Sequence, residues 1–215
     1  VSNPPYSVPW DGDSDATLIN DPRFSPAGVL APRSKADFAF TMHMLSWLSA
    51  EGTAAIVEFP GVLYRSGAEQ KIRKYLVSNN FVDTIIQMPQ NLFFGTPIAT
   101  CLLILKKNKA DNRVCFIDAS NEGNKNKLSP ENISKIYNAY MNKEEIAYFS
   151  HVVTIADIAE EDYNLSVSTY VEQEDTREKI DITELNTRIS KIVAIEEQLR
   201  KDIDEIILQL EGGAA

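Results

Sequence analysis

The sequence predicts an α/β fold, namely the second half of a doubly wound sheet followed by a long C-terminal helix. Four short runs are continuous in apolar residues, as buried strands tend to be, and they cover residues 53–59, 82–88, 100–105 and 114–119. Helical periodicity fills the segment between the first two runs, and a heptad pattern fills the end of the chain. Ligands of open α/β sheets bind beyond the carboxyl ends of the strands, so we expect the functional residues there.

The composition is that of an ordinary globular protein, because 44% of the 215 residues are hydrophobic. No apolar run approaches the roughly 18 residues that span a bilayer, and no signal peptide is evident. We therefore expect a cytoplasmic protein without a membrane partner. The formal net charge of −10 is unfavourable for a chain that has to hold nucleic-acid phosphates unaided.

The cysteines and histidines give no sign of a metal site. Cys101 and Cys115 lie in apolar runs and lack a C-x-x-C partner, so they are expected to behave as small hydrophobic residues. His43 falls in an apolar helical pattern and His151 in an expected loop. We expect all four to be structural and no metal to be bound.

Four helices of the globular part are predicted from their N-terminal capping patterns. A Ser or Thr is followed three residues later by an acid, or directly by Pro, and the four starts are Ser34 with Asp37, Ser66 with Glu69, Ser129 with Pro130, and Thr154 with Asp157. The first helix should end by Gly52 and the second at Asn79 and Asn80. The third should bury one stripe, formed by Ile133, Ile136, Tyr137 and Tyr140.

The connections between the strands favour a mixed sheet. A helix between the first two strands argues for parallel pairing through a right-handed crossover, whereas the shorter link from the second to the third permits an antiparallel pair. Three segments would then reach the carboxyl edge of the sheet, namely residues 3–6, 61–65 and 89–95. Residues 7–33 form a long loop whose cations, together with Lys35, could contact phosphate or be solvated surface charges.

The sequence Asn3-Pro4-Pro5-Tyr6 combines three groups that suit a planar base carrying an amino group. Consecutive prolines fix φ and lack N–H donors, so the segment stays extended with free carbonyl groups. The Asn3 amide and the Pro4 carbonyl offer acceptors, and the Tyr6 ring offers a flat face. Enzymes that modify an exocyclic amine flip the base out of the duplex and stack it on such a ring. Taken alone, the four residues could also be a simple turn.

Further blocks follow in order, namely Asp21–Phe24, Ser34–His43, Gly61–Arg65, Asn91–Thr96, Phe116–Ser120 and Asp162–Leu165. This succession, from Asn3 to about Val171, resembles the modification (methyltransferase) subunit of type I restriction-modification systems, an adenine-specific DNA methylase with a Rossmann-like sheet. The resemblance implies that the adenine amino group lies between Asn3 and Pro4, that Tyr6 stacks on the base, and that S-adenosylmethionine supplies the methyl group.

With the resemblance, the expected substrate site also includes Pro5 of the motif and, outside the motif, Arg65 and Phe94. Phe94 could instead pack beneath the base. No glycine-rich turn from a strand to a helix, of the kind that receives a nucleotide cofactor, occurs in the sequence. We therefore interpret residues 1–171 as a partial catalytic domain, expect the cofactor-contacting residues upstream of Val1, and expect the chain to be inactive alone.

Residues 172–215 are predicted to form a linker and one long helix for assembly. Asp181 and Glu184 form a capping box, and an apolar heptad seam interrupted by Glu196 comprises Ile182, Leu185, Ile189, Ile192, Leu199, Ile203, Ile206 and Leu210. Such a seam has to be buried, either against its own domain or against a partner. The resemblance favours partners: the specificity subunit, a second copy of the methylase subunit and, where one is present, the restriction subunit.

Two alternative functions remain open at the level of the sequence. The chain could be a non-catalytic helical interaction module whose α/β part is only a scaffold. It could also belong to a methylase of amino groups in RNA or protein, since N-P-P-Y occurs in such enzymes too. The blocks S-K-A-D-F-A-F and G-V-L-Y-R favour the restriction-modification family.

Overall fold

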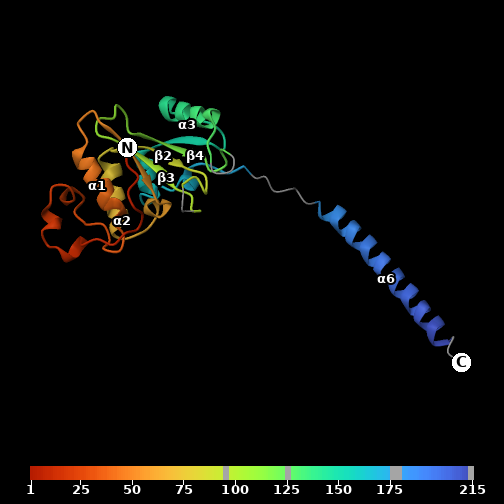
Figure 1. Ribbon diagram of the computed structural model, residues 1–215. Coiled ribbons are helices and arrows are strands. Elements are labelled where there is room, and N and C mark those ends of the chain that lie inside the picture. The colour runs from red at the N-terminus through yellow and green to blue at the C-terminus, as the bar shows by residue number, and fades with distance from the viewer. Residues whose placement is uncertain (94–96, 124–126, 175–180, 213–215) are drawn as a thin grey trace. The chain divides into compact units, whose positions relative to one another are not determined.

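The computed structural model describes residues 1–93, 97–123, 127–174 and 181–212. The chain divides into two compact units, Val1–Glu174 and Asp175–Ala215. The first unit holds a mixed sheet with helices on both faces, and the second holds one long helix (Figure 1).

The sheet of the first unit contains five strands in the order β1-β3-β2-β4-β5. Their bounds are Thr53–Glu58 for β1, Val82–Gln87 for β2, Cys101–Lys106 for β3, Arg113–Asp118 for β4 and Ser150–Thr154 for β5. Strands β1, β2 and β4 run in one direction, and β3 and β5 run in the other. The first four strands confirm the strands that the apolar runs predict.

The pairing of β1 with β2 that we expected is wrong, although both run in the same direction. Strand β3 lies between them and pairs antiparallel with each. The short connection from β2 lets the chain fold straight back, so β3 pairs with β2 on the side of β1, and the connection through α2 passes across β3. Strand β5 was not predicted because only two of its five residues, Val152 and Val153, are apolar, so it forms no apolar run. His151 therefore lies in a strand and not in a loop, where its Nδ1 is 2.8 Å from Glu145 Oε2.

Helices cover the two faces of the sheet unequally. Their bounds are Asp37–Trp47 for α1, Ala68–Ser78 for α2, Pro130–Asn142 for α3, Ile155–Glu160 for α4 and Val167–Tyr170 for α5. The larger core lies under α1 and α2 and includes Phe38, Ile72 and Leu103, whereas α3 covers a smaller core on the opposite face (Figure 1). Each fully buried side chain of this size stabilises the fold by about 1.5–3 kcal/mol.

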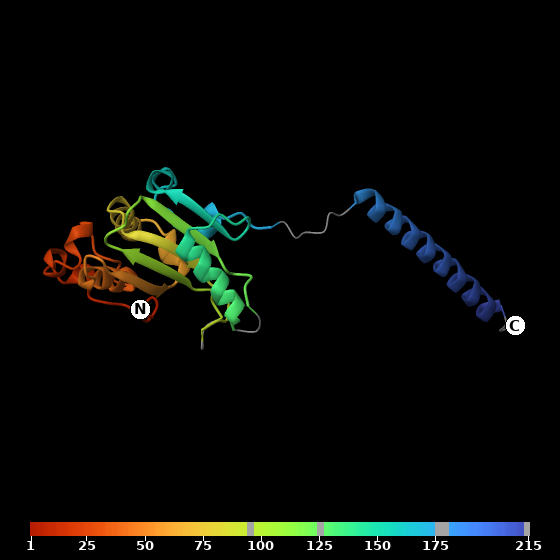
Figure 2. The same ribbon diagram turned by 90° about the horizontal axis from the view of Figure 1, so that it is seen from above.

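The long loop before α1 contains short 3-10 helices at Gly12–Ser14, Leu18–Asn20 and Ser25–Ala27. Both views show it gathered beside α1 and α2, on one side of the sheet (Figures 1 and 2). Phe24 and Leu30 from this loop are buried in the larger core, which explains why a segment without regular periodicity is still ordered. A fourth 3-10 helix, Pro60–Leu63, follows β1.

Two of the four predicted helix caps are confirmed and two are wrong. Ser129 and Thr154 each form a complete capping box, with Asn132 and Asp157 respectively. Ser34 and Ser66 cap nothing, because Ala36 and Gly67 stand at the N-caps of α1 and α2 without a side-chain hydrogen bond. The acids of those two patterns have other partners: Asp37 accepts from the Ser7 N–H, and Glu69 accepts from Arg65.

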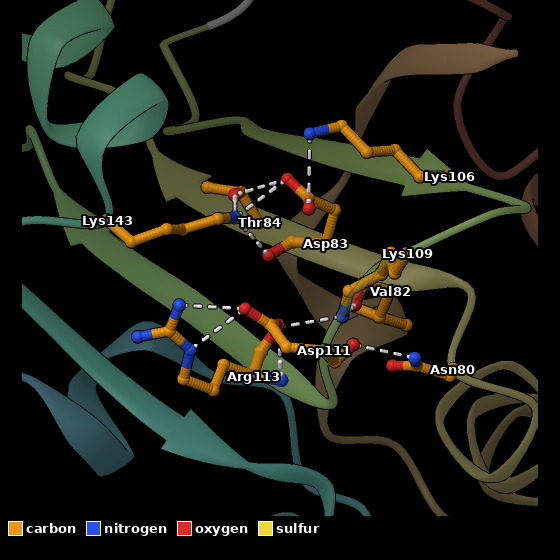
Figure 3. Close-up of polar contacts among 9 residues, drawn as sticks. All are labelled: Asn80, Val82, Asp83, Thr84, Lys106, Lys109, Asp111, Arg113 and Lys143. Atoms are coloured by element: carbon orange, nitrogen blue, oxygen red, sulfur yellow. Dashed lines mark hydrogen bonds and ion pairs between the residues drawn. The ribbon is translucent and has the colours of Figure 1, made fainter. Parts of the chain in front are cut away.

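The buried stripe predicted for α3 is only partly correct. Ile136 is buried and Tyr140 is half-buried, but Ile133 and Tyr137 are more than half exposed. Ala139 takes the second buried position instead. Helix α3 is also held by Lys143, the residue that follows it, whose ammonium group donates to the buried carboxylate of Asp83 in β2 (Figure 3).

Helix α6 (Ile182–Gly212) forms the second unit. Asp181 caps it by accepting from the backbone N–H groups of Thr183 and Glu184. The predicted seam residues are all exposed within this unit, at fractions between 43% for Leu185 and 73% for Leu210. Within the part of the chain that the structure describes, no helix is long and apolar enough to cross a membrane.

Candidate functional site

The N-P-P-Y segment starts directly from the sheet. Ser2 forms a parallel bridge with Ile56: its N–H donates to the Ala55 carbonyl at 3.0 Å, and its carbonyl accepts from the Val57 N–H at 2.9 Å. The chain therefore enters along β1 and leaves it toward the carboxyl end of that strand. This places residues 3–6 at the edge where open α/β sheets bind ligands.

The amide of Asn3 and the ring of Tyr6 are already in contact. The Tyr6 hydroxyl donates to Asn3 Oδ1 at 2.7 Å. Pro4 is buried, Asn3 and Pro5 are exposed, and Tyr6 is half-buried. The structure therefore brings together the two side chains that the sequence predicted to act on one base, and the amide oxygen keeps a second lone pair for another donor.

Tyr6 forms one wall of a pocket of about 430 Å³. The described residues that line it are Tyr6, Ser7, Lys35, Phe59, Arg65, Ile98 and Thr100. Two aromatic rings provide flat faces, two side chains are cationic, and none of these residues carries a carboxylate. The volume falls in the range of small-molecule sites.

Arg65, predicted to contact substrate, belongs to the wall of this pocket. Its guanidinium lies 5.1 Å from the centroid of the Phe59 ring, and its Nη1 is 3.1 Å from Glu69 Oε1. A Cβ at Gly61 would lie 2.4 Å from Arg65 Nη2, so only glycine leaves room for this arrangement. Pro5 is not among the lining residues, and Phe94 lies outside the described residues.

The loop that carries Arg65 is held in place by a fully buried arginine of α2. Arg73 donates from Nε to the Tyr163 carbonyl and from Nη1 to the Val62 carbonyl, both at 2.8 Å. Burial lowers the pKa of Arg73 to about 10. The side chain thus links α2, the loop after β1 and the segment after α4, which are far apart in the sequence.

Buried acids lie next to the pocket, and sequence reasoning missed them. Glu58, the last residue of β1, is fully buried; its Oε1 accepts from Thr41 Oγ1 at 2.5 Å and its Oε2 has no partner. Burial is the main cause that raises the pKa of Glu58 to about 8, against the hydrogen bond from Thr41. Asp37 accepts from the backbone N–H of Ser7 at 2.7 Å. A glutamate inside the apolar run of residues 53–59 was the signal that could have revealed the site.

A second cavity, of about 740 Å³, lies at the carboxyl ends of β2 and β4. Amide and hydroxyl side chains dominate its described lining, including Gln87, Asn91 and Ser120. Ala99 faces this cavity, whereas its neighbours Ile98 and Thr100 face the first. The segment entering β3 therefore separates the two cavities.

The described residues offer no cluster of His, Cys, Asp or Glu that could hold a metal ion. Cys101 and Cys115 are buried and free, as predicted. Burial raises the pKa of both thiols, which makes them poor nucleophiles.

A family described as N-6 DNA Methylase matches residues 1–179. The chain belongs to this family. It is 51% identical, over 96% of its length, to the type I restriction enzyme MpnII methylase subunit of Mycoplasma pneumoniae, and 35% identical, over 99%, to the MjaVII methylase subunit of Methanocaldococcus jannaschii. The chain spans 39% and 38%, respectively, of the length of these two relatives.

The solved structures agree with the family. The methyltransferase subunit of a type I restriction-modification system from Streptococcus thermophilus is 46% identical, with a TM-score of 0.76 over 79% of this chain and 37% of that one. A second solved structure comes from work on the complex assembly and conformational transition of a type I restriction-modification system. It is 15% identical to this chain with a TM-score of 0.61, which shows a shared fold. These likenesses confirm the predicted Rossmann-like methyltransferase fold and the resemblance to type I modification subunits.

Proposed function

We propose that this chain is the base-binding part of an adenine-specific DNA methyltransferase subunit of a type I restriction-modification system. The reaction moves a methyl group to the 6-amino group of a flipped adenine. One observation carries the proposal: Asn3 and Tyr6 are in contact at the carboxyl edge of a methyltransferase sheet, beside a pocket with aromatic walls. Family membership and the curated relatives support it. With DNA as the substrate, the cytoplasm stays the expected location.

In this proposal Asn3, Pro4 and Tyr6 hold the reacting base. Its amino group donates one hydrogen to Asn3 Oδ1 and the other to the Pro4 carbonyl, and its ring stacks on Tyr6. Two acceptors draw electron density toward the nitrogen and direct its lone pair away from both of them. Asn3 can keep its bond from the Tyr6 hydroxyl meanwhile, because a carbonyl oxygen accepts twice. No general base is needed before transfer.

S-adenosylmethionine is the methyl donor that the family implies, but the described residues do not fit it. The connection from β1 to α2 contains Gly61, and the space beside this glycine is filled by Arg65 and Phe59. No other strand in the described residues leads directly into a glycine-rich turn and a helix. We therefore assign no residue of this chain to the cofactor and propose that another part of the protein binds it.

Replacement of Asn3 tests the role of the motif. In the complete, assembled protein, Asn3→Ala should lower the single-turnover rate of methyl transfer to a cognate duplex about a hundredfold or more, roughly 3 kcal/mol, because it removes an acceptor aimed at developing charge. Tyr6→Ala should cost about 1–3 kcal/mol in capture of the base, and Tyr6→Phe should be mild. DNA affinity should change little with Asn3→Ala, since phosphate contacts dominate binding.

Asn138→Ala provides the matched control, because Asn138 is exposed on α3, away from the motif. It should leave the rate unchanged. An Asn3→Ala protein that transfers methyl at the wild-type rate would eliminate this mechanism. A wild-type protein that methylates RNA or a protein but no DNA would favour the second alternative function.

We further propose that α6 mediates assembly with the specificity subunit, a second methylase subunit and, where present, a restriction subunit. Its seam residues are exposed within their own unit, and so regular an apolar stripe is costly in water. Ile192→Asp combined with Ile203→Asp should abolish copurification or self-association, because it buries charges in the interface. Thr187→Asp with Ala194→Asp adds the same charge away from the seam and should leave assembly intact. Assembly that survives the first pair would remove the proposal.

A further inference from the structure

We infer that Lys35 binds a phosphate of the target nucleotide in the pocket at Tyr6, whereas Arg65 serves as part of the pocket wall. The inference rests on the proposed function, because it requires a nucleotide in that pocket. The two cations line the same cavity, but only Arg65 has a carboxylate partner among the described residues.

The two residues that follow Lys35 are hydrogen-bonded to the residues that follow the N-P-P-Y segment. The N–H of Ala36 donates to the Val8 carbonyl at 2.9 Å, and the Asp37 carboxylate accepts from the Ser7 N–H at 2.7 Å. The start of α1 is thereby joined to the residues that follow Tyr6. A cation carried at this junction keeps a constant position relative to the stacking ring, as a binding residue should.

The ammonium group of Lys35 has no hydrogen bond or ion pair to another described residue, although its side chain is half-buried. Its charge is felt by the Glu69 carboxylate, but that carboxylate pairs directly with Arg65. Arg65 is thus compensated by Glu69 and packed on the Phe59 ring. Lys35 therefore has donors to give to an anion, whereas Arg65 would first have to give up its partner.

The other walls of the pocket define what that anion accompanies. Tyr6 and Phe59 offer flat aromatic faces, Ser7 offers a hydroxyl group, and none of the described lining residues is acidic. A planar ring linked to a negatively charged group matches these walls, and a nucleotide within a DNA strand is such a ligand. A base alone would leave the Lys35 charge unpaired.

The salt dependence of DNA binding tests this inference. With the complete, assembled protein and a duplex carrying the target site, Lys35→Gln should weaken binding about tenfold. It should also reduce the slope of log K against log salt by about one, because one phosphate contact is lost. Lys35→Arg should restore the slope. Lys71→Gln, at an exposed position on α2, is the matched control and should behave as wild type.

A second duplex localises the contact. It carries neutral methylphosphonates in place of the phosphates on either side of the target adenine. Wild type and Lys35→Gln should bind this duplex equally, because the charge that Lys35 contacts is gone. The inference fails if Lys35→Gln keeps the wild-type salt slope, or if Arg65→Gln is the variant that loses one unit of it. A wild-type protein that does not methylate the unmodified duplex would instead overturn the proposed function.

Discussion

Two buried carboxyl groups belong to the same sheet, and they are treated in opposite ways. Asp83 lies near the start of β2 and is surrounded by donors: Lys143 Nζ at 2.8 Å, Thr84 Oγ1 at 2.9 Å and Lys106 Nζ at 3.2 Å (Figure 3). Glu58 ends β1, at the opposite edge, and has only the Thr41 hydroxyl. Since β1 and β2 run in the same direction, the paired acid marks the amino edge and the unpaired acid the carboxyl edge.

The pKa values of the two groups move in opposite directions for a physical reason. Burial alone would raise both. For Asp83 the hydrogen bond and charge of Lys143, with help from Thr84 and Lys106, outweigh burial, and its pKa is lowered. For Glu58 burial dominates and raises the pKa to about 8.

Unsatisfied buried polar atoms gather beside the pocket at Tyr6. Within the described residues, four buried side-chain oxygens lack a partner, and those of Asp37, Glu58 and Thr100 lie in or beside the pocket at Tyr6; the fourth belongs to Asn80. Native proteins leave few such atoms, and those they leave call for an explanation. At the amino edge the polar groups around Asp83 are paired and stabilise the fold, whereas three of the four unpaired oxygens gather beside the pocket.

The largest effect expected from this comparison is on stability at the amino edge. Asp83→Ala leaves the ammonium groups of Lys106 and Lys143 without their carboxylate, and it should lower the free energy of unfolding by roughly 3 kcal/mol, because removal of one partner of a buried pair is costly. Urea unfolding followed by tryptophan fluorescence measures it, since Trp10 and Trp47 both belong to the first unit.

An exposed ion pair close to this cluster supplies the control. Asp111 lies 2.7 Å from Arg113, and the two side chains are 43% and 54% exposed (Figure 3). Asp111→Ala should therefore cost less than about 1 kcal/mol. Equal losses in Asp83→Ala and Asp111→Ala would mean that burial and pairing of Asp83 add no stability beyond that of an exposed ion pair.

The N-terminal ends of the helices could be predicted from the sequence only in part. The same local pattern, a hydroxyl followed three residues later by a capping partner, holds at Thr154 and fails at Ser34 and Ser66. In the failing cases tertiary partners claim the acid, since Asp37 binds the Ser7 backbone and Glu69 binds Arg65. Local propensity cannot anticipate such competition. The strands were predictable because burial on both faces leaves a signal within each run.

In the candidate site, too, contacts between residues close in sequence could be predicted, and contacts between distant residues could not. Asn3 and Tyr6 could be predicted to act together because they are three residues apart in one rigid segment. The pairing of Glu58 with Thr41 joins β1 to α1 across 17 positions, and no pattern in the sequence encodes it. The contrast between Lys35 and Arg65 also depends on which cation finds a carboxylate, which only the folded chain decides.

A further expected effect is a pH dependence that the two edges should show with opposite sign. The pKa of Glu58 is raised from its ordinary value of 4.5 to about 8 by burial, so the folded protein binds more protons than the unfolded chain between these values. The contribution of Glu58 to stability is therefore complete below about pH 4.5 and lost as the pH rises to about 8, by at most about 1.4 kcal/mol per pH unit. The contribution of Asp83, whose pKa is lowered, is present above about pH 4 and lost as the pH falls further.

Glu58→Gln isolates the first dependence, because an amide resembles the protonated acid in shape and cannot ionise. Relative to wild type, the variant should gain stability steadily as urea unfolding is repeated from about pH 5.5 to about pH 7.5, a window in which Asp83 does not titrate. Glu160→Gln, at an exposed position of α4, should keep a constant difference from wild type over the same range. If Glu58→Gln also keeps a constant difference, the carboxyl group is ionised throughout. The carboxyl edge would then hold a buried charge with only the Thr41 hydroxyl as donor, and the contrast with Asp83 would concern geometry alone.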